Sequence, residues 1–121
     1  MIGKAYTTVV PYFDMISKTQ KFKSRPCLII GQADSGDYVI LPISTISDKS
    51  RIDSEYDIPL RSSAFTFLHH DSYLRTHKQT VVNKASLKTE IADFKLNYVD
   101  AYAEALSKVK KFQLTMIANA L

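Results

Sequence analysis

The sequence predicts a mainly β fold, in which a small, strongly curved sheet or barrel is covered by C-terminal helices. Up to Asn83, short runs rich in β-branched and aromatic residues alternate with turn-forming residues, which is typical of strands. After Asn83, apolar residues recur at spacings of three and four, as they do in amphipathic helices. For a chain of 121 residues we expect one domain over residues 1–121, with strands at roughly 4–83 and helices at roughly 86–121.

The first strands are expected on either side of a cationic loop. Residues 4–13, KAYTTVVPYF, have strand composition, and the polar residues 14–25 that follow read as a mobile basic loop. The run PCLIIGQ, residues 26–32, is continuously apolar until its end, as in a strand buried on both faces. The turn ADSGD then leads into YVILPIST, residues 38–45, and predicts a hairpin.

The later elements are shorter. YDIPL, residues 56–60, is expected as a strand, and residues 72–83 are expected as one further strand, with or without a bulge. Ser86 is a candidate N-cap for a short helix over residues 86–95. Asn97 is a candidate cap for a second helix that begins at Tyr98. Its expected apolar face is Val99, Tyr102, Leu106, Val109 and Phe112 or Gln113, with Lys108, Lys110 and Lys111 on the solvated side.

Charge and cysteine content restrict the partners and the compartment. The excess of Lys and Arg gives a net charge of +4, which favours anionic partners, with nucleic acid first and an anionic membrane second. Cys27 is the only cysteine, so no intrachain disulfide can form, and we expect a cytoplasmic protein in which this thiol packs as a small hydrophobic residue. We also expect no export signal and no membrane span, because no apolar run approaches about 18 residues.

The stretch TFLHHDSYLRTHKQTVVN, residues 66–83, is the first candidate site. Strand alternation from Ser72 would place Tyr73, Arg75, His77 and Gln79 on one face, with Lys78 on the other. Tyr73 can stack a base, Arg75 can bind a phosphate through two parallel donors, and His77 can exchange protons near neutral pH. The alternative is a solvated sheet face with an arginine packed on a tyrosine. No metal site is expected, because the adjacent His69 and His70 point apart in an extended chain and neither HExxH nor CxxC spacing is present.

Two further clusters contribute candidates. Ser44 and Thr45 end an apolar strand, where hydroxyl groups can face a cleft, although turn chemistry alone also explains them. Arg25 directly precedes Pro26, which favours an extended backbone and fixes the direction of the arginine. Lys18, Lys21 and Lys23 lie just upstream and can attract a polyanion, although they also suit a solvated loop.

Together these segments resemble the PemK/MazF family of toxin ribonucleases, also called mRNA interferases. The resemblance rests on a strand and basic segment leading into RPCLIIG, on VILPIST, on SYLRTHKQTVVNKASL and on a C-terminal helix, in that order. It implies an SH3-like barrel with added helices, a homodimer, cleavage of single-stranded RNA without metal or cofactor, and neutralisation by a cognate antitoxin protein.

The resemblance also implies site residues. It places the family's arginine before proline at Arg25, its strand-end hydroxyl at Ser44 or Thr45, and a further arginine at Arg75. Some members carry an acidic residue two positions after that arginine, where this chain has His77. We therefore expect an arginine clamp, a hydroxyl donor and His77 as the proton carrier in one cleft. The rival interpretations are a barrel that binds RNA or a protein without cleaving, and an interaction protein whose last helix docks on a partner.

Overall fold

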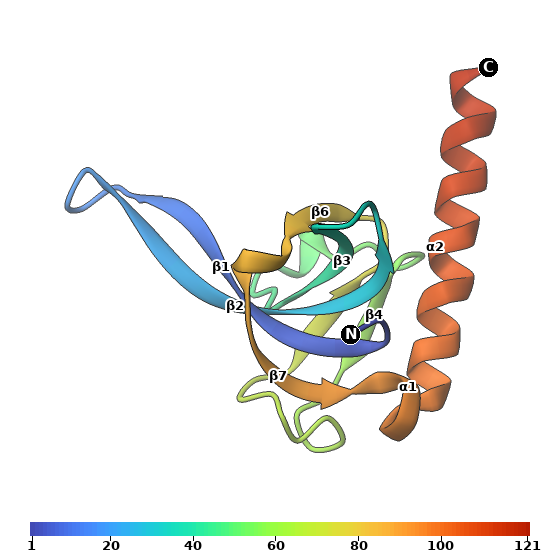
Figure 1. Cartoon of the computed structure of the whole chain (residues 1–121), viewed down its shortest axis with the longest axis horizontal. Coiled ribbons are helices and arrows are strands. Elements are labelled where there is room, and N and C mark those ends of the chain that lie inside the picture. The colour runs from blue at the N-terminus through green and yellow to red at the C-terminus, as the bar shows by residue number, and fades with distance from the viewer.

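One curled antiparallel sheet forms the body of this computed structural model (Figure 1). The structure describes residues 1–121 except for the side chains of Pro11 and Tyr12. Within that part of the chain, the sheet has seven strands in the order β4-β5-β3-β2-β1-β7, with β6 paired to β3. Their bounds are β1 Lys4–Asp14, β2 Thr19–Gln32, β3 Asp37–Ser44, β4 Asp57–Leu60, β5 Ser72–Arg75, β6 Thr80–Asn83 and β7 Leu87–Asp93. The predicted mainly β class with a C-terminal helix is confirmed.

Strand β3 is the branch point of the sheet, because its two halves have different neighbours. Residues 37–40 pair with β6, whereas Ile43 and Ser44 pair with Leu74 and Tyr73 of β5. On its other edge β3 pairs with β2, which confirms the predicted hairpin. The end of β3 therefore lies directly beside β5, and this brings the Ser44 segment next to the Arg75 segment.

Strand β2 is buried on both faces in its second half, as its apolar run predicted. Leu28 belongs to the main core under α2, and Cys27 and Ile29 belong to a second cluster on the opposite face. Burial raises the pKa of the Cys27 thiol to about 11, so this thiol is protonated and unreactive at neutral pH.

The predicted mobile loop at residues 14–25 is wrong. This segment is the outer part of a long hairpin in which β1 and β2 pair from Ala5↔Leu28 out to Asp14↔Thr19, and Figure 1 shows it projecting from the body. Backbone pairing with β1 orders the polar residues, although their composition is that of a loop. Lys18 at the tip has a φ of 55°, the left-handed conformation that closes the turn.

The segment from Ser72 to Asn83 is two strands rather than the one predicted. Strand β5 ends at Arg75, and β6 begins at Thr80. Between them the chain turns, with the Lys78 N–H donating to the Arg75 carbonyl at 3.2 Å. The buried Thr76 hydroxyl also donates to the Tyr56 carbonyl at 2.6 Å, which fixes the point where the chain leaves β5. The predicted alternation therefore holds only as far as Arg75.

The helix predicted at residues 86–95 is also wrong. The segment consists of a short 3-10 turn, η2 (Lys84–Ser86), then strand β7, and then a single helical turn, α1 (Phe94–Asn97). Asn83 caps the 3-10 turn and Asp93 caps α1. Edge pairing of β7 with β1 overrides the helical propensity of its Lys, Glu and Ala residues.

Helix α2 (Val99–Ala120) closes the open side of the sheet with its first half and extends past the body with its second (Figure 1). Its buried positions are Ala105 and Val109, whereas Val99 and Leu106, predicted on the core face, are exposed. Tyr98, rather than Asn97, occupies its N-cap. Lys108 and Lys111 contact Glu55 by a hydrogen bond and an ion pair, so the predicted solvated face partly contacts the body. Among the described residues, none of the helices combines the length and the hydrophobicity that a membrane span requires.

Candidate functional site

Four of the residues predicted for the site line one polar pocket of about 220 Å³. Arg25 comes from β2, Ser44 and Thr45 from the end of β3, and Arg75 from the end of β5. The pocket is completed by Ile46, Ser47, Asp48 and Arg51. These segments are distant in the sequence and meet because β3 pairs with both β2 and β5.

Arg25 is an exposed cation of the pocket, as is Arg51. Within the described part of the chain the Arg25 guanidinium has no hydrogen-bond or ion-pair partner, and its neighbour Pro26 begins the half-buried stretch of β2. An arginine without a protein partner keeps all five of its N–H donors available to a ligand.

Two of the three hydroxyl residues of the pocket lie where β3 ends: Ser44 is its last residue and Thr45 follows it. Ser44 is half-buried and Thr45 is exposed. The Thr45 hydroxyl lies 3.5 Å from the Ser72 hydroxyl, which donates to the His70 carbonyl at 2.9 Å. Thr45 is thus held against β5, and Ser44 is free to present its hydroxyl to a ligand.

Arg75, in contrast, is held by its neighbours. Its Nε donates to the Asp57 carboxylate at 3.1 Å, and its Nη2 donates to the other carboxylate oxygen at 3.4 Å and to the Arg51 carbonyl at 3.3 Å. Asp57 is directly opposite Arg75 in the β4–β5 register, and its side chain is 0% exposed. The position of this guanidinium is therefore fixed from beneath the pocket.

His77, which was predicted to share the cleft, is not among the residues that line it. Because the chain turns after Thr76, the imidazole packs under α2, stacked on Tyr56 with ring centroids 5.8 Å apart and close to Phe112. Its buried Nδ1 has no hydrogen-bond partner among the described residues and lies 3.7 Å from the Asp57 carboxylate. Burial lowers the pKa of His77 against the opposing effect of Asp57, so the imidazole is neutral at physiological pH.

The other predicted contacts lie around this pocket rather than in it. Tyr73 lines a neighbouring hollow with Lys49 and Arg61. Lys78 is exposed in the β5–β6 turn. Gln79 bonds to Thr76 and Gln113 and so ties that turn to α2.

The three predicted lysines are on the projecting hairpin. Lys18 lies at its tip, Lys21 forms an ion pair with Asp14 at 2.8 Å, and Lys23 is exposed on β2. Lys21, Lys23 and Arg25 alternate along β2 and therefore share one face of the hairpin. This cationic face leads from the tip of the hairpin to the pocket.

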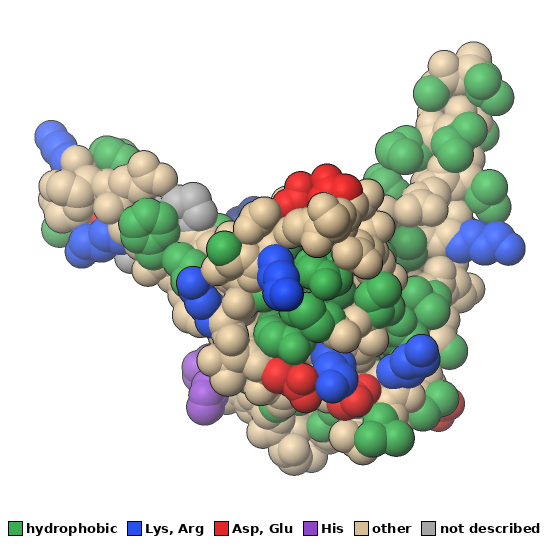
Figure 2. All heavy atoms as spheres, viewed as in Figure 1, with side chains coloured by type: hydrophobic (Ala, Val, Ile, Leu, Met, Phe, Trp, Pro, Cys, Tyr) green, Lys and Arg blue, Asp and Glu red, His purple; other side chains and the backbone are tan. Residues whose placement is uncertain are grey.

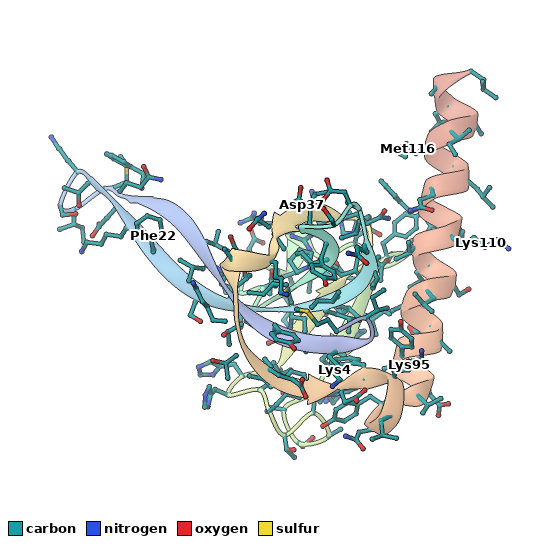
Figure 3. The ribbon with its side chains drawn as sticks, viewed as in Figure 1. Lys4, Phe22, Asp37, Lys95, Lys110 and Met116 are labelled. Atoms are coloured by element: carbon teal, nitrogen blue, oxygen red, sulfur yellow. The ribbon has the colours of Figure 1, made fainter. Side chains whose placement is uncertain are left out.

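Two larger hollows adjoin the pocket. One, of about 470 Å³, is mainly apolar, includes Arg25, Pro26, Ile40 and Val81, and lies between the hairpin base and β6. The other, of about 320 Å³, includes Thr45, Phe67, His69 and His70. Elsewhere on the body, Figure 2 shows a group of hydrophobic side chains near Lys4 and Lys95, which Figure 3 labels in the same view. A long anionic ligand that occupied the pocket would have room to continue in either direction.

Three charged residues of this region were not singled out from the sequence. Asp48 caps the 3-10 turn η1 (Lys49–Arg51), Arg51 is the last residue of that turn, and Asp57 opens β4. The Ser50 side chain and backbone donate to Asp48 at 2.7 and 3.0 Å and hold the pKa of this carboxyl below its usual value. Asx-turn composition in SDKSR was the available signal for Asp48. Asp57 had none, because its partner is known only from the strand register.

The pocket combines guanidinium groups, hydroxyl donors and one carboxylate around a space open to solvent. This set can bind a tetrahedral oxyanion and stabilise charge that grows on it. The described residues contain no cluster of three His, Cys, Asp or Glu side chains suited to a metal ion.

Comparison with protein-family models matches residues 9–110 to the family described as PemK-like, MazF-like toxin of type II toxin-antitoxin system. The matched range includes every residue that lines the polar pocket. A search of curated proteins finds no match.

Proposed function

The chain belongs to the PemK-like, MazF-like toxin family of type II toxin–antitoxin systems, and from this premise we propose that it is an endoribonuclease that cleaves single-stranded RNA. The observation that carries the proposal is the meeting of Arg25, Ser44 and Arg75 around one polar pocket. We further propose that the chain acts as one domain, as a cytoplasmic homodimer, and is neutralised by a cognate antitoxin protein.

The proposed reaction is an attack of the ribose 2′-hydroxyl on its own phosphorus. The bond from phosphorus to the 5′-oxygen breaks, and the products are a 2′,3′-cyclic phosphate and a 5′-hydroxyl. Negative charge develops on the non-bridging oxygens in the transition state. Arg25 and Arg75 are suited to stabilise that charge, and the Ser44 or Thr45 hydroxyl can donate a further hydrogen bond.

The proton of the 2′-hydroxyl needs an acceptor inside the pocket. His77 packs outside it, so we assign this role to Asp48, the carboxylate that lines the pocket. Its lowered pKa keeps it ionised at neutral pH, and the exposed site allows the 5′-oxygen to take a proton from water. His77 then has a packing role against Tyr56 and Phe112 instead of a role as proton carrier.

Cleavage of a long RNA in the presence of EDTA tests the proposal. We expect discrete fragments that end in cyclic phosphate, and an Arg25→Ala or Arg75→Ala variant should cleave about 10²- to 10³-fold more slowly. Lys110→Ala, an exposed change on α2, is the control and should cleave normally. Retention of intact RNA by the wild-type protein without fragments would identify a non-catalytic binding module instead.

Replacing each candidate proton acceptor in turn shows whether Asp48 or His77 has this role. Asp48→Asn should lower the cleavage rate by about 10²-fold or more, whereas His77→Ala should retain most activity in a folded sample. With Asp48 as the base, the rate should stay nearly constant from about pH 5.5 to 7.5, because hydrogen bonds from Ser50 lower the pKa of this carboxyl and an ordinary aspartate is already ionised in that range. An inflection between about pH 6 and 7 that vanishes in His77→Ala would restore His77 as the proton carrier.

A further inference from the structure

Asp57 is a fully buried carboxylate beneath the polar pocket, and the proposed chemistry does not use it. Its side chain is 0% exposed. Burial of a charge is unfavourable unless it is paired and hydrogen-bonded. A role for this carboxylate should therefore be sought in the groups that it contacts.

The Asp57 carboxylate forms hydrogen bonds along one edge of the Arg75 guanidinium. Oδ1 accepts from Nε at 3.1 Å and Oδ2 accepts from Nη2 at 3.4 Å. Oδ2 also accepts from the Asp53 backbone N–H at 2.8 Å, which anchors the carboxylate to the turn before β4. The Arg51 carbonyl accepts from Nη2 as well.

This arrangement leaves one nitrogen of Arg75 for a ligand. Nε and Nη2 both have protein acceptors, whereas Nη1 has no hydrogen-bond partner among the described residues. Arg75 lines the pocket although its side chain is only 15% exposed. A planar fork held along one edge cannot rotate without breaking two charge-assisted bonds.

We infer that Asp57 is a positioning residue for Arg75, which holds the guanidinium so that Nη1 meets the phosphate of the RNA. The inference rests on the proposed ribonuclease function. It assigns to Asp57 no contact with RNA and no proton transfer. Asp57 acts only through Arg75, by fixing a donor before the transition state forms, so that no reorganisation is needed when charge develops.

Loss of the Asp57 charge and loss of its positioning role should have opposite effects on the protein's action on RNA, so the two can be distinguished. Replacing Asp57 with Asn removes a negative charge next to the pocket, so attraction of RNA alone should become stronger. If Asp57 positions Arg75, however, Asp57→Asn should lower kcat about tenfold to a hundredfold, with affinity for an uncleavable 2′-deoxy oligonucleotide unchanged or increased. Asp37→Asn is the matched control: it removes a carboxylate that contacts Asn83 at the other end of β3 and should change neither quantity.

A double-mutant cycle shows whether the effect passes through Arg75. In an Arg75→Ala background, Asp57→Asn should cause no further loss of kcat. This double variant also avoids leaving a buried ion without its partner, a change that can prevent folding. If Asp57→Asn lowers kcat by the same factor with and without Arg75, or if it leaves kcat unchanged, the inference is overturned.

A spectroscopic readout separates failure of this inference from failure of the proposed function. In the wild-type protein without RNA, the Arg75 Nε–H signal should be visible by nuclear magnetic resonance and should exchange slowly with water, whereas that of Arg25 should exchange rapidly. Asp57→Asn should accelerate the exchange at Arg75. Rapid exchange at Arg75 in the wild-type protein would exclude the positioning role even if RNA is cleaved. Slow exchange in a protein that does not cleave RNA would reject the proposed function while leaving the clamp in place.

Discussion

Arg25 and Arg75, two of the three arginines that line the pocket, are held in different ways, and this difference predicts different responses to lysine. Arg75 is fixed by Asp57 and the Arg51 carbonyl, whereas Arg25 is exposed and has no protein partner in the described part of the chain. A lysine ammonium can replace a point charge but not a planar fork. We expect Arg75→Lys to lower the cleavage rate at least about tenfold more than Arg25→Lys, as measured with one RNA under identical conditions. Equal losses for the two variants would argue against a fixed Arg75.

His77 should make the stability of the protein depend on pH. Burial lowers its pKa in the folded state, so the unfolded chain binds a proton at a higher pH than the folded protein does. The contribution of His77 to stability is therefore complete above the unfolded pKa of about 6.5 and is lost as the pH falls through the lower folded value. Urea unfolding at pH 7.5 and pH 5 should show a smaller loss of stability for His77→Phe than for the wild type. Parallel losses in the two proteins would contradict the lowered pKa.

Among single residues, the sequence predicted those site residues that their immediate neighbours in the sequence identify. An arginine before a proline and a hydroxyl at the end of an apolar strand identified Arg25 and Ser44, and both line the pocket. Asp57 and the location of His77 could not be predicted, because they depend on the β4–β5 register and on a turn at Thr76 that the alternating pattern does not reveal.

Among the elements, the start of β1 and the single turn α1 are joined through Gly3. This glycine has a φ of 89°, and its carbonyl accepts from the backbone N–H groups of Phe94 and Lys95. A Cβ at this position would lie 2.8 Å from the Lys95 Cβ. Gly3→Ala should therefore destabilise the protein by about 1–3 kcal/mol in urea unfolding.

Gly31→Ala is the matched control for that change. It lies in β2, where an added Cβ meets nothing within 4 Å, so we expect a change within about 0.5 kcal/mol. Similar effects at both glycines would contradict the close packing of Gly3 on α1.

Strands could be predicted where burial requires apolar residues. They could not be predicted where backbone pairing with another strand orders polar residues. The apolar run of β2 and the strand ending at Ser44 were predicted from composition because both contribute to the core. The outer hairpin and β7 were predicted as loop and helix, since their polar residues have weak strand propensity. They are strands because β1 supplies backbone partners on both of its edges, a long-range effect that no local window contains.

The whole molecule has two projections that carry exposed apolar side chains. One is the β1–β2 hairpin, with Phe13 and Phe22, and the other is the far half of α2, with Leu114 and Ile117. Figure 3 labels Phe22 on the hairpin and Met116 on the helix, both away from the body. Extended apolar surfaces of this kind are typical of protein interfaces, which agrees with the proposed homodimer and antitoxin partner.

The far half of α2 provides a test of the homodimer. Leu114 and Ile117 on α2 and Leu121 directly after it recur at helical spacing and are 58%, 54% and 100% exposed. We expect sedimentation of a dimer of the 13.7 kDa chain. A Leu114→Ser, Ile117→Ser double variant should raise the dissociation constant at least about tenfold by removing buried apolar area. Thr115→Ser on the same turn is the control, and a wild-type protein that sediments as a monomer at all concentrations would exclude the homodimer.

The proposed cleavage depends most on Arg25 and Arg75 acting on the same phosphate. Cleavage rates of the wild type, the two single alanine variants and the double variant, measured with EDTA present on one RNA, test this directly. If the arginines share one phosphate, each single change should slow cleavage about 10²- to 10³-fold and the double variant should be much less impaired than the product of the two effects. Effects that multiply fully, or a single variant that cleaves at the wild-type rate, would contradict the account.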